Sequence, residues 1–292
     1  MTPIPRLVPH DRPLWKDLIL LIAKSLTTVL TFILILVLGG VTLAALWEGD
    51  TSISDGSCTI AVLPVEGAIL PFSGLAGFDL VVTPSVIEDF MDAAEADPSI
   101  EGVLVEINSP GGTPVASHRV SERLHNSSLP VVGLIGDIGA SGGYMVAAAT
   151  DFLIASPMSD VGSIGVNGSY VENSQQNKEE GLTYVQLVTG EFKDTGSPDK
   201  PITDEERALL QQDLDDIHDE FVDIVSEYRE LDRAYVASLA DGSSMPGRRA
   251  EQADLVDAVG DRDEARSALA ALLQKTPDEI TFCEYQAPLL PI

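Results

Sequence analysis

Residues 131–155 read VVGLIGDIGASGGYMVAAATDFLIA and contain the pattern that decides the fold. Val131–Ile135 and Asp151–Ala155 are short apolar runs, which are typical of buried strands. Between them, Ala140–Ala149 follows a glycine-rich turn and is predicted to form a helix. A strand, a helix and a second strand in close succession form the repeating unit of a parallel sheet. This stretch therefore predicts an α/β domain.

The same alternation continues on both sides of this stretch. Cys58–Val65 and Gly102–Ile107 have the composition of further buried strands. Pro84–Ala96 and Val115–Asn126 have the apolar periodicity of helices. Leu182–Val188 predicts one more strand, which leads into a polar loop.

The last third of the chain begins with a long acidic helix, predicted from Thr203 to about Arg229. Thr203 can cap this helix, and Glu206 completes a capping box with it. A helix so rich in charge usually forms a solvated face or a packing arm between subunits. Ala250–Gly260 and Glu264–Leu273 have the patterns of a last strand and a closing helix.

An uncharged segment, SLTTVLTFILILVLGGVTLAALW, occupies residues 25–47. At about 1.5 Å per residue, a helix of this length reaches roughly 35 Å and can cross a bilayer core. The residues before it hold a small positive excess, whereas the chain from residue 48 onward carries a net charge of −31. The positive-inside rule therefore predicts a cytoplasmic N-terminus. A cleaved signal peptide is the alternative, but its apolar stretch is normally shorter.

The composition argues against several kinds of partner. The chain has 46 acidic and 17 basic residues, a formal net charge of −29, so we expect no nucleic-acid partner. The four histidines form no cluster, and neither Cys58 nor Cys283 has a metal-ligand spacing. We therefore expect no metal. Two cysteines are also too few for a disulfide scaffold.

Ser141 lies between small residues, just after a predicted strand and at the start of a predicted helix. Amides at a helix N-terminus favour an anion beside them. A serine at this point can attack a carbonyl while neighbouring amides hold the developing oxyanion. The alternative is that Ser141 only caps the helix and that the glycines only pack it. This segment by itself does not decide between the two.

Residues 107–112 read INSPGG and end a buried strand. A Pro-Gly-Gly corner leaves backbone amides that no ladder uses, and these can face a substrate carbonyl or an extended peptide. The alternative is an ordinary tight turn between a strand and a helix. His118 and His125 lie on the predicted helix that follows. One of them could serve as the general base for Ser141 in a Ser-His-Asp arrangement. Paired polar residues on such a helix more often face solvent.

Four motifs in order resemble those of the signal peptide peptidase A family, whose members have a Clp/crotonase-like fold. They are NSPGG at 108–112, GASGGYMVA at 139–147, VGSIGV at 161–166 and GEFKDTGSP at 190–198. The resemblance covers roughly residues 58–275. It implies a mainly parallel sheet with flanking helices, together with one N-terminal transmembrane helix.

The resemblance implies a Ser/Lys dyad, with Ser141 as nucleophile, Lys193 as general base and Ser163 hydrogen-bonded to the lysine. The pKa of a free lysine is about 10.4, so a base working near neutral pH needs a pKa lower by about three units. Burial away from carboxylates lowers the pKa of an amine in this way. The carboxylates of Glu191 and Asp194, which flank Lys193, must therefore point away from it.

The resemblance also assigns the amides of Gly112 and Gly142 to an oxyanion hole, with Gly111 shaping the corner. It implies no cofactor. Family members with one catalytic domain per chain form rings in which the serine and the lysine of one site come from neighbouring protomers. We therefore expect a homo-octamer whose dyad is shared between protomers.

Together these patterns divide the chain into five parts. Residues 1–24 form a cytoplasmic segment, 25–47 a transmembrane anchor, 48–57 a linker, 58–275 a protease domain and 276–292 a C-terminal tail. The expected function is that of a single-pass cell-membrane serine endopeptidase whose catalytic domain lies outside the cytoplasm. Its substrates would be cleaved signal peptides and other extended apolar peptides. Two alternatives are a related protease with a narrow membrane-protein target and a catalytically silent, ring-forming scaffold.

Overall fold

The computed structural model describes residues 19, 21, 22, 24–35, 53, 56–72 and 80–283. The chain divides into two units, Met1–Thr51 and Ser52–Ile292. In the first unit, residues 24–35 are helical and exposed. Within the part of the chain that the structure describes, no helix combines the length and the apolar character needed to cross a membrane. Residues 36–47 of the predicted anchor lie outside the described residues, so the anchor stays a prediction.

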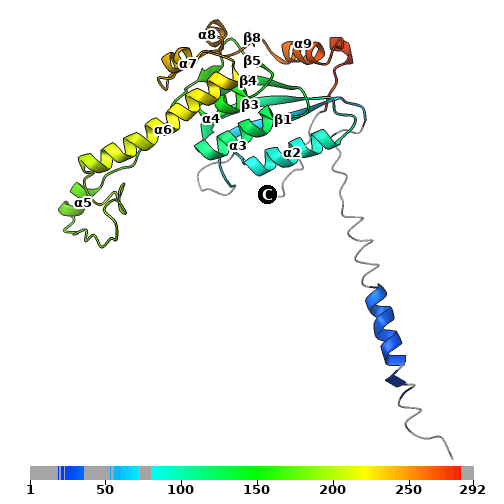
Figure 1. Cartoon of the computed structure of the whole chain (residues 1–292), viewed down its shortest axis with the longest axis horizontal. Coiled ribbons are helices and arrows are strands. Elements are labelled where there is room, and N and C mark those ends of the chain that lie inside the picture. The colour runs from blue at the N-terminus through cyan, green and yellow to red at the C-terminus, as the bar shows by residue number, and fades with distance from the viewer. Residues whose placement is uncertain are drawn as a thin grey trace, which may run out of the picture. The chain divides into compact units, whose positions relative to one another are not determined.

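Strands and helices alternate along the second unit (Figure 1). The strands are β1 (Ile60–Ile69), β2 (Val81–Val82), β3 (Gly102–Gly112), β4 (Val131–Ala140), β5 (Phe152–Ala155), β6 (Asp160–Gly162), β7 (Ser244–Pro246), β8 (Ala258–Val259) and β9 (Phe282–Cys283). The helices are α2 (Pro84–Ala96), α3 (Pro114–His125), α4 (Gly142–Ala148), α5 (Ser174–Glu179), α6 (Asp204–Tyr228), α7 (Arg233–Leu239), α8 (Gly247–Gln252), α9 (Arg262–Leu272) and the 3₁₀ turn η1 (Pro277–Glu279).

These strands form a single sheet with the order β2-β1-β3-β4-β5-β8. Strand β9 lies beside β1, and β6 joins β4 to β7. The pairs are parallel except for β6–β7. Because parallel neighbours need a crossover, α2 connects β2 to β3, α3 connects β3 to β4, and α4 connects β4 to β5. The predicted α/β fold with a mainly parallel sheet and flanking helices is confirmed.

Both faces of the sheet are covered, which explains why its strands are apolar without interruption. On β1, Ala61 and Leu63 belong to the core that includes α2, α3, α4 and α6. Their neighbours Ile60 and Val62 pack on the opposite face against Leu269 of α9. Side chains alternate between faces because the period of a strand is about two residues. Figure 1 shows α2 and α3 on one side of the sheet and α9 on the other.

The predicted strand Leu182–Val188 is wrong. These residues have no sheet partner in the described part of the chain, and all of them are exposed. They follow α5, which lies beside the N-terminal end of α6 and away from the sheet (Figure 1). A strand forms only where a neighbouring strand pairs with its backbone, and no strand among the described residues reaches this place. We call residues 170–203 the arm.

The predicted last strand, Ala250–Gly260, is also wrong in most of its length. Helix α8 covers its first residues, and only Ala258–Val259 form a strand. Leu255 and Val256 are buried as the pattern required, but they lie in the turn after α8. Apolar runs this short do not distinguish a strand from a buried turn.

The long acidic helix is confirmed as α6. The Thr203 hydroxyl accepts a hydrogen bond from the Glu206 amide at 3.1 Å. The Glu206 carboxylate in turn accepts one from the Thr203 amide at 3.0 Å. This is the predicted capping box, which satisfies two backbone donors at the start of the helix.

A disulfide joins Cys58 to Cys283, whose Cα atoms are 5.1 Å apart. It ties the start of β1 to β9, where Phe282 pairs with Ile60. The chain beyond residue 276 therefore continues into the sheet before the described residues end. Two cysteines make no scaffold, but this single bond closes a loop with a sequence separation of 225 residues.

We expect a Cys58→Ser variant to lose about 2–5 kcal/mol of unfolding free energy, because the bond restricts a very long loop in the unfolded chain. The measurement is denaturant unfolding with and without a reductant. A reductant should lower the unfolding midpoint of the parent protein to that of the variant. It should leave the midpoint of the variant unchanged. Equal midpoints for the two proteins under oxidising conditions would contradict this.

Candidate active site

Ser141 occupies the turn between β4 and α4 in a strained conformation, with φ 52° and ψ −126°. Positive φ costs a non-glycine residue about 1–3 kcal/mol, and such residues concentrate at functional sites. The surrounding structure holds this conformation on both sides. The Ser141 amide donates to the Gly162 carbonyl at 2.7 Å, and the Ser141 carbonyl accepts from the amides of Tyr144 and Met145 at 2.9 and 3.0 Å.

Helix α4, which follows Ser141, is buried along its whole length. The fully buried Tyr144 extends from it and donates its hydroxyl hydrogen to the Leu255 carbonyl at 2.8 Å. This burial and this hydrogen bond hold the first turn of α4 in place against the surrounding core. The serine at its N-terminus therefore has a defined position relative to the sheet.

The three glycines predicted at the site meet beside Ser141. A Cβ added to Gly111, whose φ is 102°, would lie 2.7 Å from the Gly142 amide nitrogen and 3.0 Å from the Ser141 Cβ. A Cβ added to Gly142 would lie 3.2 Å from the Gly112 amide nitrogen. Gly142 is the first residue of α4, so its amide has no acceptor within the helix. Two backbone amides beside a serine are the arrangement that an oxyanion hole requires.

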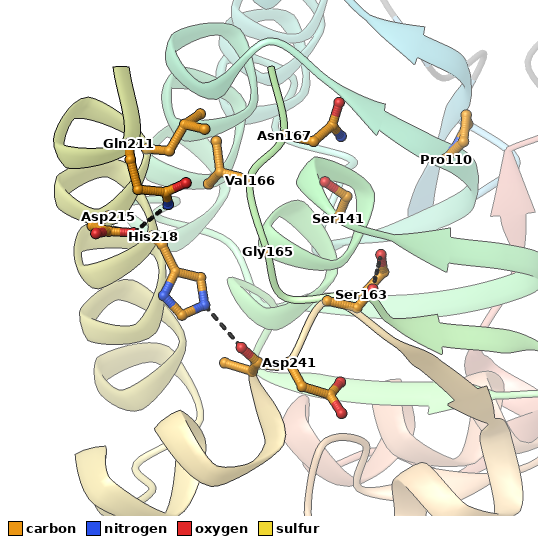
Figure 2. Close-up of a pocket in the computed structure, with 13 residues that line it drawn as sticks. Pro110, Ser141, Ser163, Gly165, Val166, Asn167, Gln211, Asp215, His218 and Asp241 are labelled. Atoms are coloured by element: carbon orange, nitrogen blue, oxygen red, sulfur yellow. Dashed lines mark hydrogen bonds between the residues drawn. The ribbon is translucent and has the colours of Figure 1, made fainter. Parts of the chain in front are cut away.

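Ser163 lies next to Ser141 because Gly162 pairs with Ala140 in the β4–β6 ladder. Ser163 also has a φ of 52°. Its hydroxyl donates to the Gly242 carbonyl at 3.0 Å. Both serines line one cavity of about 410 Å³, which Figure 2 shows.

The other wall of this cavity comes from α6, which the sequence did not connect with the site. Gln211, Asp215 and His218 line it, and Gln211 donates to Asp215 at 2.8 Å. The His218 Nε2 lies 2.9 Å from the Ala240 carbonyl oxygen (Figure 2). An acidic helix normally indicates a solvated face, so only the fold reveals that one side of α6 borders the cavity. The spacing of these residues, three and four apart, is the one signal in the sequence.

The alternative Ser-His-Asp arrangement through His118 or His125 has no support in this geometry. His118 lines a separate groove with Val115 and Ile217. His125 stacks on Tyr228 with ring centroids 4.3 Å apart. Within the part of the chain that the structure describes, neither histidine lines the cavity that Ser141 shares with Ser163 or the smaller one beside Met145.

Lys193 lies on the arm and does not line either of these cavities as the described residues form them. It is exposed, and its amide donates to the Gly190 carbonyl at 3.3 Å. No carboxylate forms an ion pair with it among the described residues. A single chain thus brings together Ser141, Ser163 and the glycines but not Lys193.

Comparison with known proteins finds a family of peptidases. Residues 123–276 match Peptidase family S49. A putative protease of Methanocaldococcus jannaschii is 36% identical over 194 residues, which are 66% of this chain and 62% of that protein. A putative signal peptide peptidase SppA of Enterococcus faecium is 31% identical over 195 residues, 66% of this chain and 56% of that protein. Protease 4 of Haemophilus influenzae is 30% identical over 225 residues, 75% of this chain and 35% of that protein.

The chain belongs to peptidase family S49, the signal peptide peptidase A family. The chain spans about three fifths of the length of the first two of these relatives. The family match covers Ser141, Ser163 and Lys193, while the Gly111–Gly112 corner lies before its first residue.

If the turn stores strain, Ser141→Gly should be about 1 kcal/mol more stable than Ser141→Ala, because only glycine adopts this conformation without cost. Denaturant unfolding of the two variants measures the difference, and neither retains the nucleophile. The control is the exposed Ser85 in α2, where the order should reverse because glycine weakens a helix. The same order at both positions would show that Ser141 is not strained.

Proposed function

We propose that this protein is a membrane-anchored serine endopeptidase with a Ser/Lys dyad. One observation carries the proposal: Ser141 is held in a strained turn beside the Gly112 and Gly142 amides, on a buried helix. A serine that only caps a helix needs no positive φ, and here its side chain makes no cap hydrogen bond. The family match agrees with this interpretation.

The proposed reaction begins when the neutral Lys193 amine accepts the Ser141 hydroxyl proton, and the Ser141 oxygen attacks the peptide carbonyl. The Gly112 and Gly142 amides stabilise the oxyanion. When the intermediate collapses, the lysine ammonium returns its proton to the leaving amine, and Ser141 is left acylated. Lys193 then deprotonates a water molecule that attacks the acyl group. When this second intermediate collapses, the ammonium gives its proton to the Ser141 oxygen, and the acyl product leaves with a new carboxyl group. Ser163 orients the amine throughout.

We propose that the lysine comes from a neighbouring protomer. Lys193 lies on an arm whose apolar side chains are exposed in the single chain, including Val185 at 70% and Leu187 at 91%. Apolar surface of this kind gains stability when another surface covers it. A closed ring, for which we propose eight members, would cover each arm with the next subunit. The isolated monomer should then be inactive.

We place the catalytic domain outside the cytoplasm, anchored through residues 25–47. The Cys58–Cys283 disulfide supports this side of the membrane, because such bonds persist in oxidising compartments and are rare in the cytosol. It is an argument independent of the charge pattern around the anchor.

The substrates we propose are cleaved signal peptides and other extended apolar peptides. A second, smaller cavity of about 90 Å³ contains Ser141 and is lined by Met145, Ile217 and Phe221. These apolar side chains suit an apolar substrate residue next to the scissile bond.

The test compares hydrolysis of a signal peptide by the full chain with that by its Ser141→Ala and Lys193→Ala variants. Each variant alone should be inactive. Assembled together from dissociated subunits, they should regain activity at about a quarter of the sites, since a site needs Ser141 from one protomer and Lys193 from the next.

The control for this experiment is a mixture of two Ser141→Ala preparations, which should stay inactive. Inactive variants that do not complement one another would contradict the shared dyad but not the nucleophile. An inactive parent protein would instead favour a catalytically silent scaffold.

A further inference from the structure

The carboxylate next to Lys193 in the sequence, that of Asp194, is turned into the arm. One of its oxygens accepts a hydrogen bond from the Tyr184 hydroxyl at 2.8 Å, and the other accepts one from the Gln186 side chain at 2.7 Å. The Asp194 side chain is only 13% exposed, although most of the surrounding loop is exposed. Its charge is therefore directed away from solvent and toward specific partners.

A cation completes these surroundings. The Lys200 ammonium lies 3.4 Å from Asp194 and forms a second ion pair with Glu206. The Glu206 side chain is 5% exposed and belongs to the capping box that starts α6. Lys200 holds the pKa of Glu206 below its ordinary value, and both carboxylates raise the pKa of Lys200. Glu206 and Lys200 therefore stay charged at neutral pH.

This cluster connects the loop that carries Lys193 to a rigid part of the molecule. Glu206 is in the first turn of α6, and the far half of the same helix is buried in the core through Phe221, Val222 and Val225. The loop that carries Lys193 is thus linked to the core of the domain through Asp194, Lys200 and helix α6. The rest of the arm has few such connections, since residues 181–193 are all exposed.

We propose that Asp194, Lys200 and Glu206 form a positioning cluster for Lys193, an inference that rests on the proposed function. The cluster has two effects. It fixes the loop, so that the amine enters a neighbouring site in one geometry. It also occupies the Asp194 carboxylate, which would otherwise stabilise the Lys193 ammonium and oppose its action as a base. Glu191, the other flanking carboxylate, is exposed and has no ion-pair partner among the described residues.

The test measures kcat and KM against pH for peptide hydrolysis by the full chain, in the parent, Lys200→Met and Lys200→Arg. We expect Lys200→Met to lower kcat about 10- to 100-fold with KM little changed, because the base is misplaced. The rising limb of its kcat profile against pH should also move to higher pH by about one unit. The sign follows because Lys200→Met leaves the Asp194 charge without its cation, and an unpaired carboxylate next to Lys193 favours the ammonium form, so a higher pH is needed to deprotonate the amine. Lys200→Arg keeps the charge and should restore most of the activity.

The matched control is Lys178→Met, which removes an exposed lysine from α5 in the same arm and should leave the profile unchanged. A Lys200→Met profile that superimposes on the parent's would overturn the inference and leave the proposed function intact. A lower melting temperature without movement of the rising limb would assign the cluster a structural role alone and would also overturn it. An inactive parent would remove the proposed function and the inference together.

Discussion

The site depends on one constraint: the backbone of Ser141 must keep a positive φ at the turn between β4 and α4. The Gly162 carbonyl fixes the turn from one side, and the fully buried α4 fixes it from the other. The Gly111 backbone can pack against Ser141 and Gly142 only because Gly111 has no Cβ. Buried structure on all sides supplies the free energy that keeps a serine in a conformation that glycine prefers. The same packing brings the Gly111–Gly112 backbone close to the Ser141–Gly142 turn.

The helix α6 has two roles that its acidic composition obscures. Its buried half packs on α4 and carries His218 on the wall of the cavity. Its first turn supports the arm through Glu206. A long helix that is rooted in the core can hold a loop at a distance from the sheet, because a helix transmits position better than an unpaired chain does. This arrangement leaves Lys193 outside the described cavities that Ser141 lines.

Much of the fold could be predicted because its strands are buried on both faces. Such strands are apolar without interruption, so β1, β3, β4 and β5 and the helices between them stand out from the polar loops. The errors occur where that reasoning does not apply. Leu182–Val188 has strand-forming residues but no neighbouring strand, and Ala250–Gly260 is buried in a turn. In both, the local pattern indicates burial or extension, but pairing depends on residues far away in the sequence.

The family and the parallel α/β architecture could be identified from the sequence, because both follow from residue types in local order. The roles of Ser141, Ser163 and Lys193 are predictions from the same motifs. Only the tertiary structure decided that the glycines meet at the serine, that Asp194 turns away from Lys193, and that α6 borders the cavity. The physical reason is that close approach and hydrogen-bond choice depend on which segments the sheet brings together. No local pattern contains that information, since the contacting residues are tens of positions apart.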